Sequence, residues 1–237
     1  MRVIPVLDLK GGLVVHATGG NRAAYRPIET PLAASADPID VTRGLLGVFP
    51  FVTLYIADLD GIAGTGRNHD SICALRSQFP ALEIWIDEGA AQTNAVAALA
   101  RMPGVRPVVG SETLPSQGRL ADLLAAGAGQ ALLSLDYKGD RLLGPAGLDE
   151  EPRLWPDTVI AMTLAAVGMD GGPELDRVAT LKRRSPTTRI VAAGGVRDIE
   201  DLRGLRTAGA SAALVATALH AKKLEAGDLS AVAGLAY

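Results

Sequence analysis

Two segments of this chain repeat each other at a distance of 128 residues. Residues 7–14 read Leu-Asp-Leu-Lys-Gly-Gly-Leu-Val, and residues 135–142 read Leu-Asp-Tyr-Lys-Gly-Asp-Arg-Leu. Two further pairs of segments match at an offset of 106 residues, namely 84–89 with 190–195 and 108–111 with 214–217. The difference between the offsets places 22 additional residues early in the first copy. Repeats of this kind predict a fold built from two similar halves.

Short apolar runs alternate with longer Ala-, Leu- and Arg-rich segments along the whole chain. Continuous apolar strands that alternate with helices are typical of a parallel sheet covered on both faces. We expect eight strands, at 3–7, 52–57, 83–87, 106–109, 131–135, 158–162, 189–193 and 212–215. We expect helices near 37–48, 68–78, 93–101, 116–126, 172–183, 198–208, 218–224 and 229–235.

Eight strand–helix units in 237 residues fit an α/β fold, the closed (β/α)8 or TIM barrel. The two halves, about 1–127 and 128–237, would each supply four units of a single domain spanning 1–237. An open, doubly wound sheet is the structural alternative, but it usually carries one glycine-rich turn after its first strand. Here glycine-rich turns follow several strands, which favours the barrel.

The composition excludes several classes of protein. Apolar residues make up 48% and charged residues 21%, with a net charge of -3, which indicates a soluble protein and argues against a basic nucleic-acid-binding surface. Cys73 is the only cysteine, so neither an intrachain disulfide nor a cysteine metal cluster is possible, and a cytoplasmic location fits. We find no secretion signal and no apolar run of the ~18 residues that a membrane span needs. The three histidines show no metal-ligand spacing, so we predict no metal centre.

Carboxylates at strand ends are the first candidates for chemistry, because a barrel of this kind builds its active site from the C-terminal ends of its strands. Asp8 and Asp136 occupy equivalent places in the repeat, and Asp170 follows the sixth expected strand. Two carboxyl groups in unlike surroundings can hold unlike pKa values, so that one acts as an acid and the other as a base. Such residues can instead cap the following turn, which is how we interpret Asp58, Asp60 and Asp140.

A glycine-rich turn after the seventh strand is the candidate phosphate site. Gly194 and Gly195 would let backbone N–H groups approach a phosphate, and the loops after strands seven and eight usually bind phosphate in this fold; a tight turn is the simpler alternative. Arg22 and Arg26 in the first long loop could clamp an anion, although a solvated loop explains them equally well. The remaining candidates at the strand ends are Gly110, Ser111, Ala216 and Thr217 for binding, with Asp87, Glu88 and Thr163 as further residues of the barrel mouth.

Five segments together resemble one family over nearly the whole chain. They are Ile-Pro-Val-Leu-Asp-Leu-Lys-Gly-Gly at 4–12, Val-Gly-Ser at 109–111, Leu-Asp at 135–136, Asp-Gly at 170–171, and Gly-Gly-Val at 194–196 with Asp-Ile at 198–199. The chain is similar in these segments to the histidine-biosynthesis barrels, namely the phosphoribosylformimino-aminoimidazole-carboxamide ribotide isomerase and its cyclase relative. That resemblance implies a duplicated half-barrel, a small phosphorylated substrate, and Asp8 with Asp170 as the acid/base pair. Asp136 matches the functional aspartate of the cyclase.

The resemblance also implies a reaction, an Amadori-type conversion of an aldose into a ketose. One carboxylic acid would protonate the ribose ring oxygen and open the ring to an imine. A carboxylate would then take the proton from the adjacent carbon, and the enol would tautomerise to the ketone. This chemistry needs no redox cofactor and no metal. The sequence predicts no particular oligomeric state.

The chain departs from the family in its two phosphate sites. Where the family has glycines after the third strand, this chain has Asp87 and Glu88 before Gly89. A carboxylate 4 Å from one phosphate charge costs about 4 kcal/mol at an effective dielectric constant near 20, so a phosphate would be repelled there. After the eighth strand, Ala216 replaces the family's glycine.

Two alternative functions remain open. The Arg22-x-x-Tyr25-Arg26-Pro27 segment, with Val-Gly at 167–168 and Gly-Pro at 172–173, resembles an uncharacterised branch of the family found in methanogens and methylotrophs. That branch implies a singly phosphorylated substrate in one-carbon cofactor metabolism, the biosynthesis of methanofuran or tetrahydromethanopterin. A non-catalytic barrel that binds a phosphorylated ligand is the other alternative. The carboxylates Asp8 and Asp136 argue against it, because unpaired carboxylates are costly to keep in a cavity.

Overall fold

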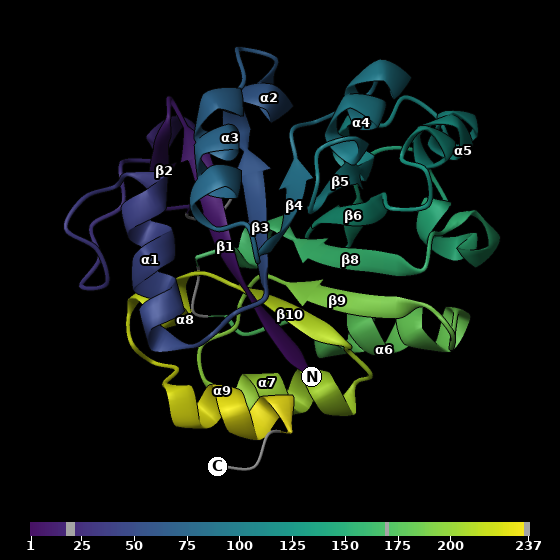
Figure 1. Cartoon of the computed structure of the whole chain (residues 1–237). Helices are drawn as coiled ribbons and strands as arrows, with labels where there is room; N and C mark the ends of the chain where they lie inside the picture. Colours follow the sequence, from purple (N-terminus) through teal and green to yellow (C-terminus); the bar gives the residue numbers. More distant parts are fainter. Residues whose placement is uncertain (18–21, 169–170, 235–237) are drawn as a thin grey trace.

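The barrel predicted from the repeat is present in the computed structural model, which describes residues 1–17, 22–168 and 171–234. Within these residues the parallel strands follow one another round a ring (Figure 1). β10 pairs with β1, with Ala212 opposite Arg2, and this pairing closes the ring. The barrel strands are β1 (Arg2–Lys10), β3 (Thr53–Asp58), β4 (Glu83–Asp87), β5 (Val105–Gly110), β6 (Leu132–Lys138), β8 (Thr158–Thr163), β9 (Arg189–Ala193) and β10 (Ala212–Val215). All eight expected strands are therefore confirmed; β1, β5, β6 and β8 are longer than the sequence predicts, and the other barrel strands have the predicted length.

Helices lie outside the ring of strands (Figure 1). The helices between and after the strands are α1 (Pro38–Val48), α2 (Leu59–Ala63), α3 (His69–Gln78), α4 (Thr93–Ala100), α5 (Gln117–Ala126), α6 (Leu175–Arg184), α7 (Ile199–Thr207), α8 (Thr217–His220) and α9 (Ala226–Ala233). Short 3-10 turns lie at η1 (Arg22–Ala24), η2 (Ser111–Thr113), η3 (Leu148–Glu150), η4 (Pro152–Leu154) and η5 (Leu164–Ala166). None of the helices among the described residues could cross a membrane.

Capping side chains explain where several helices begin. The side chains of Asp37, Ser116 and Asp198 each accept hydrogen bonds from backbone N–H groups of the first turn of α1, α5 and α7. The backbone conformation explains why α6 begins later and α8 ends earlier than the sequence predicts. α6 begins only after Gly172, whose φ of +84° is incompatible with a helix, and α8 ends before Lys222, whose φ is +54°.

Two hairpins that the sequence analysis did not predict lie at equivalent places in the repeat. β2 (Leu13–Val15) pairs antiparallel with the end of β1, and β7 (Arg141–Leu142) pairs in the same way with the end of β6. Their turns contain Gly11 and Gly139, with φ values of +59° and +60°. The repeated Lys-Gly dipeptide therefore marks a reversal of the chain, because glycine adopts this backbone conformation without strain.

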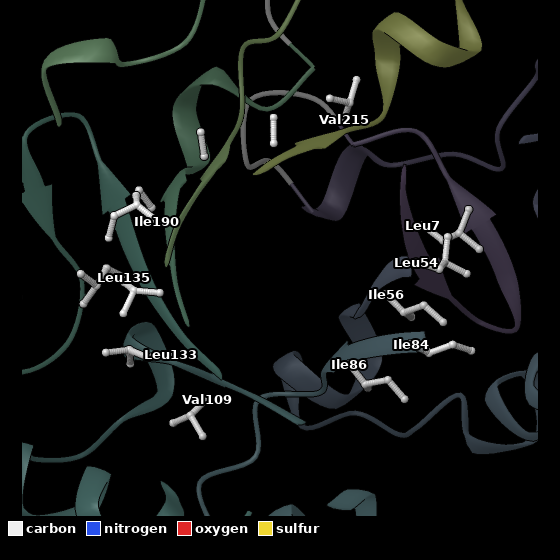
Figure 2. Packing of buried hydrophobic residues seen from close by; sticks show 14 of the residues in the cluster. Leu7, Leu54, Ile56, Ile84, Ile86, Val109, Leu133, Leu135, Ile190 and Val215 are labelled. Atoms are coloured by element: carbon white, nitrogen blue, oxygen red, sulfur yellow. The ribbon is translucent and has the colours of Figure 1, made fainter. Parts of the chain in front are cut away.

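Side chains alternate between two apolar layers along every barrel strand. One layer faces the helices, and Figure 2 shows its labelled members from both halves of the chain, such as Leu7, Ile86 and Leu135, lying round a ring. The second layer, with Tyr55 and Trp85, belongs to a separate cluster that fills the inside of the barrel. Because both faces of a strand are buried, the period of two is hidden in a continuous apolar run. This alternation turns Val6 and Asp8 of β1 away from the helices and into the barrel.

Candidate active site

A cavity of about 300 Å³ opens at the C-terminal ends of the barrel strands. Most of its wall is apolar, which is typical of a small-molecule site. The apolar side chains include Val6, Ala57, Leu59, Ile62, Met162, Leu164, Val167 and Leu214. The polar and charged side chains are Asp8, Arg22, Tyr25, Tyr55, Asp87, Glu112, Asp136, Lys138 and Thr217, and the backbone of Gly194, Gly195 and Ala216 completes the wall. The cavity thus contains most of the residues that the strand ends predicted.

The side chain of Asp8 lies in the cavity, and its carboxyl group has no hydrogen-bonding partner among the described residues. The parallel register places it beside Ala57, which in turn lies beside Asp87, so the two carboxyl groups share one level of the barrel. Burial raises the pKa of Asp8 to about 7, and the positive charge of Arg22 opposes part of that rise. A carboxyl group that is both protonated and ionised near neutral pH suits general acid/base catalysis.

Asp136 is the equivalent residue of the second half, but its surroundings differ. Its carboxylate accepts hydrogen bonds from Ser134 Oγ at 2.6 Å, Ser111 Oγ at 3.3 Å and the backbone N–H of Glu112 at 3.0 Å. Burial raises its pKa to about 6, against the lowering effect of these hydrogen bonds. In the repeat, Val6 takes the place of Ser134, which removes one donor from Asp8. The predicted difference in surroundings between the paired carboxylates is therefore present.

Asp87 is a third buried carboxylate of the cavity. It accepts a hydrogen bond from the backbone N–H of Gly89 at 3.0 Å and a long one from the Tyr55 hydroxyl at 3.5 Å. Burial raises its pKa to about 7, and the nearby charge of Asp136 adds to that effect. A Cβ atom on Gly110 would lie 3.3 Å from an oxygen of each of these two carboxylates, so they flank the same glycine.

The raised pKa of Asp87 predicts a pH-dependent stability. Between the ordinary value of 3.8 and the folded value of about 7, the folded protein binds more protons than the unfolded chain, so stability falls as the pH rises through this range. The variant Asp87→Asn cannot ionise, and we expect it to be more stable than the wild type at about pH 8, by at most ~4 kcal/mol. The gain should disappear at about pH 4. Urea unfolding at both pH values measures it, and a variant less stable than the wild type at the higher pH would contradict it.

Arg22 and Arg26, predicted together as an anion clamp, are placed apart. Arg22 lines the cavity and forms an ion pair with Glu112, while its own carbonyl accepts a hydrogen bond from Lys10 Nζ at 2.9 Å. Arg26 is exposed, lies outside the cavity lining and donates to the carbonyl of Tyr25 at 3.4 Å. Of the two arginines, only Arg22 is therefore positioned to contact a ligand in the cavity.

The glycines after β9 allow the turn that contains them to pack closely against the loop after β8. Gly194 and Gly195 have φ values of +99° and +82°. A Cβ atom on Gly194 would lie 2.6 Å from the carbonyl oxygen of Thr163, and one on Gly195 would overlap the backbone of Gly172. Both glycines also line the cavity, together with Ala216 and Thr217. The tight turn thus explains why these residues are glycines, and the same turn leaves a surface without side chains at one end of the cavity.

Several other candidates lie outside the cavity lining. Ser111 is fully buried, Glu88 forms an ion pair with Arg67 at 3.6 Å, and the Thr163 hydroxyl accepts a hydrogen bond from Arg177 at 2.9 Å. Gly110 is also absent from the lining, and Asp170 lies outside the described residues. The described residues contain no group of three or more His, Cys, Asp or Glu side chains that could hold a metal ion.

The interpretation of Asp58 and Asp60 as structural residues is supported by their contacts. Asp58 is fully buried and accepts hydrogen bonds from the backbone N–H groups of Gly61 and Asn68. Asp60 accepts one from the backbone N–H of Gly11 at 2.6 Å, which joins α2 to the first hairpin.

Four polar residues of the cavity were not predicted from the sequence as site residues, namely Tyr25, Tyr55, Glu112 and Lys138. Every position of β3 is buried, so no alternation marks Tyr55 as facing inward. Glu112 directly follows the repeated segment 108–111, so its position after a strand end is the signal that points to it. Lys138 lies within the repeated segment 135–142, and the Lys-Gly dipeptide shared by both copies is the signal that points to it.

Comparisons with known proteins identify relatives that match nearly the whole chain. An uncharacterised protein of Methanocaldococcus jannaschii is 30% identical over 226 residues, covering 93% of each chain. The 1-(5-phosphoribosyl)-5-((5-phosphoribosylamino)methylideneamino)imidazole-4-carboxamide isomerase of Myxococcus xanthus is 29% identical and covers 98% of each chain. The isomerase of the same name from Thermus thermophilus is 27% identical over 93% of this chain and 94% of its own. None of these three names refers to one-carbon cofactor metabolism, so that alternative gains no support from them.

The sequence profile of the family described as "histidine biosynthesis protein" matches residues 2–225, nearly the whole barrel. The resemblance seen in the sequence motifs is thereby confirmed, and the chain belongs to the histidine biosynthesis protein family.

Proposed function

We propose that this protein is an aldose–ketose isomerase that acts on a small phosphoribosyl compound. One observation supports this above all others. Asp8, a carboxyl group with a pKa of about 7 and no hydrogen-bonding partner among the described residues, shares a cavity with the side-chain-free loops at Gly194 and Gly195. The relatives named as phosphoribosyl isomerases add support, because they match this chain over almost its full length.

The proposed reaction assigns two proton transfers to carboxyl groups. One group, in its acid form, protonates the ribose ring oxygen and opens the ring to an imine. A second, in its ionised form, removes the proton from the adjacent carbon, and the resulting enol rearranges to the ketone. Asp8 can serve in either step, because near its pKa both of its forms are populated. Asp136, held by three donors, and Asp170 are the candidates for the second group.

Phosphate would bind where backbone approaches the cavity without side chains. Gly194, Gly195 and Ala216 line that end, and Thr217 adds a hydroxyl group. The apolar wall between this end and the carboxylates offers a surface for the non-polar faces of a ring. The partner implied by this arrangement is a small phosphorylated substrate.

Turnover of a synthetic substrate in heavy water tests the proposal. Condensing ribose 5-phosphate with aniline gives a ribosylamine that can undergo the proposed rearrangement. We expect the protein to convert it into the 1-amino-1-deoxyketose with one solvent deuterium on C1, the former imine carbon. The proton removed from C2 passes to a carboxyl group that exchanges with the solvent, and the enol then takes up a deuteron at C1 as C2 becomes the ketone. Proton NMR follows both changes. If the protein produces neither ketose nor exchange above the rate of heat-inactivated protein, the proposed function is wrong.

A further inference from the structure

The repeat supplies two equivalent pairs of loops, and they are used differently. In the second half, Gly195 after β9 and Thr217 after β10 line the cavity. Their equivalents in the first half are Gly89 after β4 and Ser111 after β5. Neither of these equivalents lines the cavity.

The donors of the first-half loops are already occupied by the protein's own carboxylates. The backbone N–H of Gly89 donates to Asp87 at 3.0 Å. The Ser111 hydroxyl and the backbone N–H of Glu112 both donate to Asp136, at 3.3 Å and 3.0 Å. A phosphate between these loops would need the same donors. In the second half, Ala193 stands in the place of Asp87, so no carboxylate can fill the corresponding position.

The space at the first-half loops is also filled. Ser111 is fully buried, and a Cβ atom on Gly144 would overlap its carbonyl group, so the chain after β7 lies directly against it. On the other side, oxygens of Asp87 and Asp136 lie 3.3 Å from the position of a Cβ on Gly110. A phosphate could enter only by displacing both carboxylates.

The charges of the cavity favour the same conclusion. Four carboxylic acids line it among the described residues, against Arg22 and Lys138 as cations, and Arg22 is paired with Glu112. Asp87 and Asp136 raise the free energy of any further negative charge beside them, while their oxygens can accept hydrogen bonds from a ligand. The end of the cavity beside the loops after β4 and β5 is therefore suited to a neutral or cationic group that donates hydrogen bonds.

We propose that Asp87 and Asp136 occupy the first-half anion position themselves, so that the substrate carries a single phosphate at the second-half loops and a non-anionic, hydrogen-bond-donating group at the other end. This inference rests on the proposed function and defines its substrate class. The named substrate of the isomerase relatives contains two phosphoribosyl groups. The two carboxylates would thus determine a specificity that differs from theirs.

Binding of a matched pair of stable ketose products tests the inference. Both ligands are N-phenyl-1-amino-1-deoxyribulose 5-phosphates; one carries a carboxamide on the phenyl ring and the other a phosphonate at the same place. In calorimetric titrations we expect the wild type to bind the carboxamide at least about tenfold more tightly than the phosphonate. Equal affinity, or preference for the phosphonate, would overturn the inference.

Variants separate a charge effect from a general loss of binding. Asp87→Asn removes one negative charge with little change in shape, and we expect it to bind the phosphonate roughly tenfold better while its affinity for the carboxamide changes little. Asp122→Asn, on the exposed face of α5 outside the cavity, serves as the matched control and should leave both affinities unchanged. If Asp87→Asn weakens both ligands alike, the residue supports the cavity and does not select against phosphate.

The outcomes also distinguish this inference from the proposed function. If the protein prefers the carboxamide ligand but forms no ketose and incorporates no deuterium, the proposed isomerase function is wrong. The single-phosphate inference then still holds as a property of ligand binding. Turnover with preference for the phosphonate ligand would retain the isomerase and remove the inference.

Discussion

The variant Asp8→Asn should lose turnover by about 10²- to 10⁴-fold, the usual contribution of one general acid or base. Asparagine has nearly the shape of aspartate but cannot give or take the proton. Because the carboxyl group of Asp8 accepts no hydrogen bond from the described residues, the substitution breaks no side-chain bond that we observe, and folding should be preserved. The ketose assay gives kcat, and circular dichroism with thermal unfolding reports on the fold.

The pH profile of the wild type provides a second measurement on the same residue. If Asp8 acts as the base in the free enzyme, kcat/KM should fall as the pH drops below about 7; if it acts as the acid, kcat/KM should fall as the pH rises above that value. Asp122→Asn again serves as the control and should keep full activity. Wild-type turnover in folded Asp8→Asn would remove Asp8 from the mechanism, and Asp136 would become the first candidate.

The variant Gly195→Ala should destabilise the protein by about 3 kcal/mol or more and abolish phosphate binding. The added Cβ would overlap the backbone of Gly172, and the φ of +82° is strained for any residue with a side chain. Either the loop after β8 or the turn after β9 must then move, and both contribute residues to the cavity. Urea unfolding measures the stability, and titration with the carboxamide ligand measures the binding.

A second glycine variant separates the stability cost of backbone strain from the cost of steric overlap. Gly64 ends α2 with a φ of +69°, and a Cβ on it would meet no atom within 4 Å. Gly64→Ala should therefore cost only the strain of the left-handed conformation, about 1–2 kcal/mol, and leave ligand affinity unchanged. Equal losses of stability in the two variants would mean that contact with the Gly172 backbone contributes nothing.

The sequence predicted the barrel because the signals for it are local. Strand runs, helix caps and turn glycines act over a few residues, so Asp37, Ser116 and Asp198 mark helix starts directly. The elements that were missed have weak local signals. α2 has five residues and contains Gly61, and β2 and β7 are short strands that gain their stability by pairing with longer ones.

The amino-acid sequence by itself determined that the chain closes into one ring and that Asp8, Asp136 and Gly195 lie at the same end of it. The repeat specifies the topology, and the position of each residue at or after the end of a parallel strand specifies the end of the barrel at which it lies. Only the tertiary structure decided which carboxylate accepts hydrogen bonds from the protein and which does not. Asp136 obtains two of its hydrogen bonds from Ser111 and Glu112, which are 25 and 24 residues away in the sequence. Asp8 has no such partner among the described residues, although its motif is nearly the same. A carboxyl group's pKa depends on its burial and on the donors around it, and both are properties of neighbours that only folding brings together.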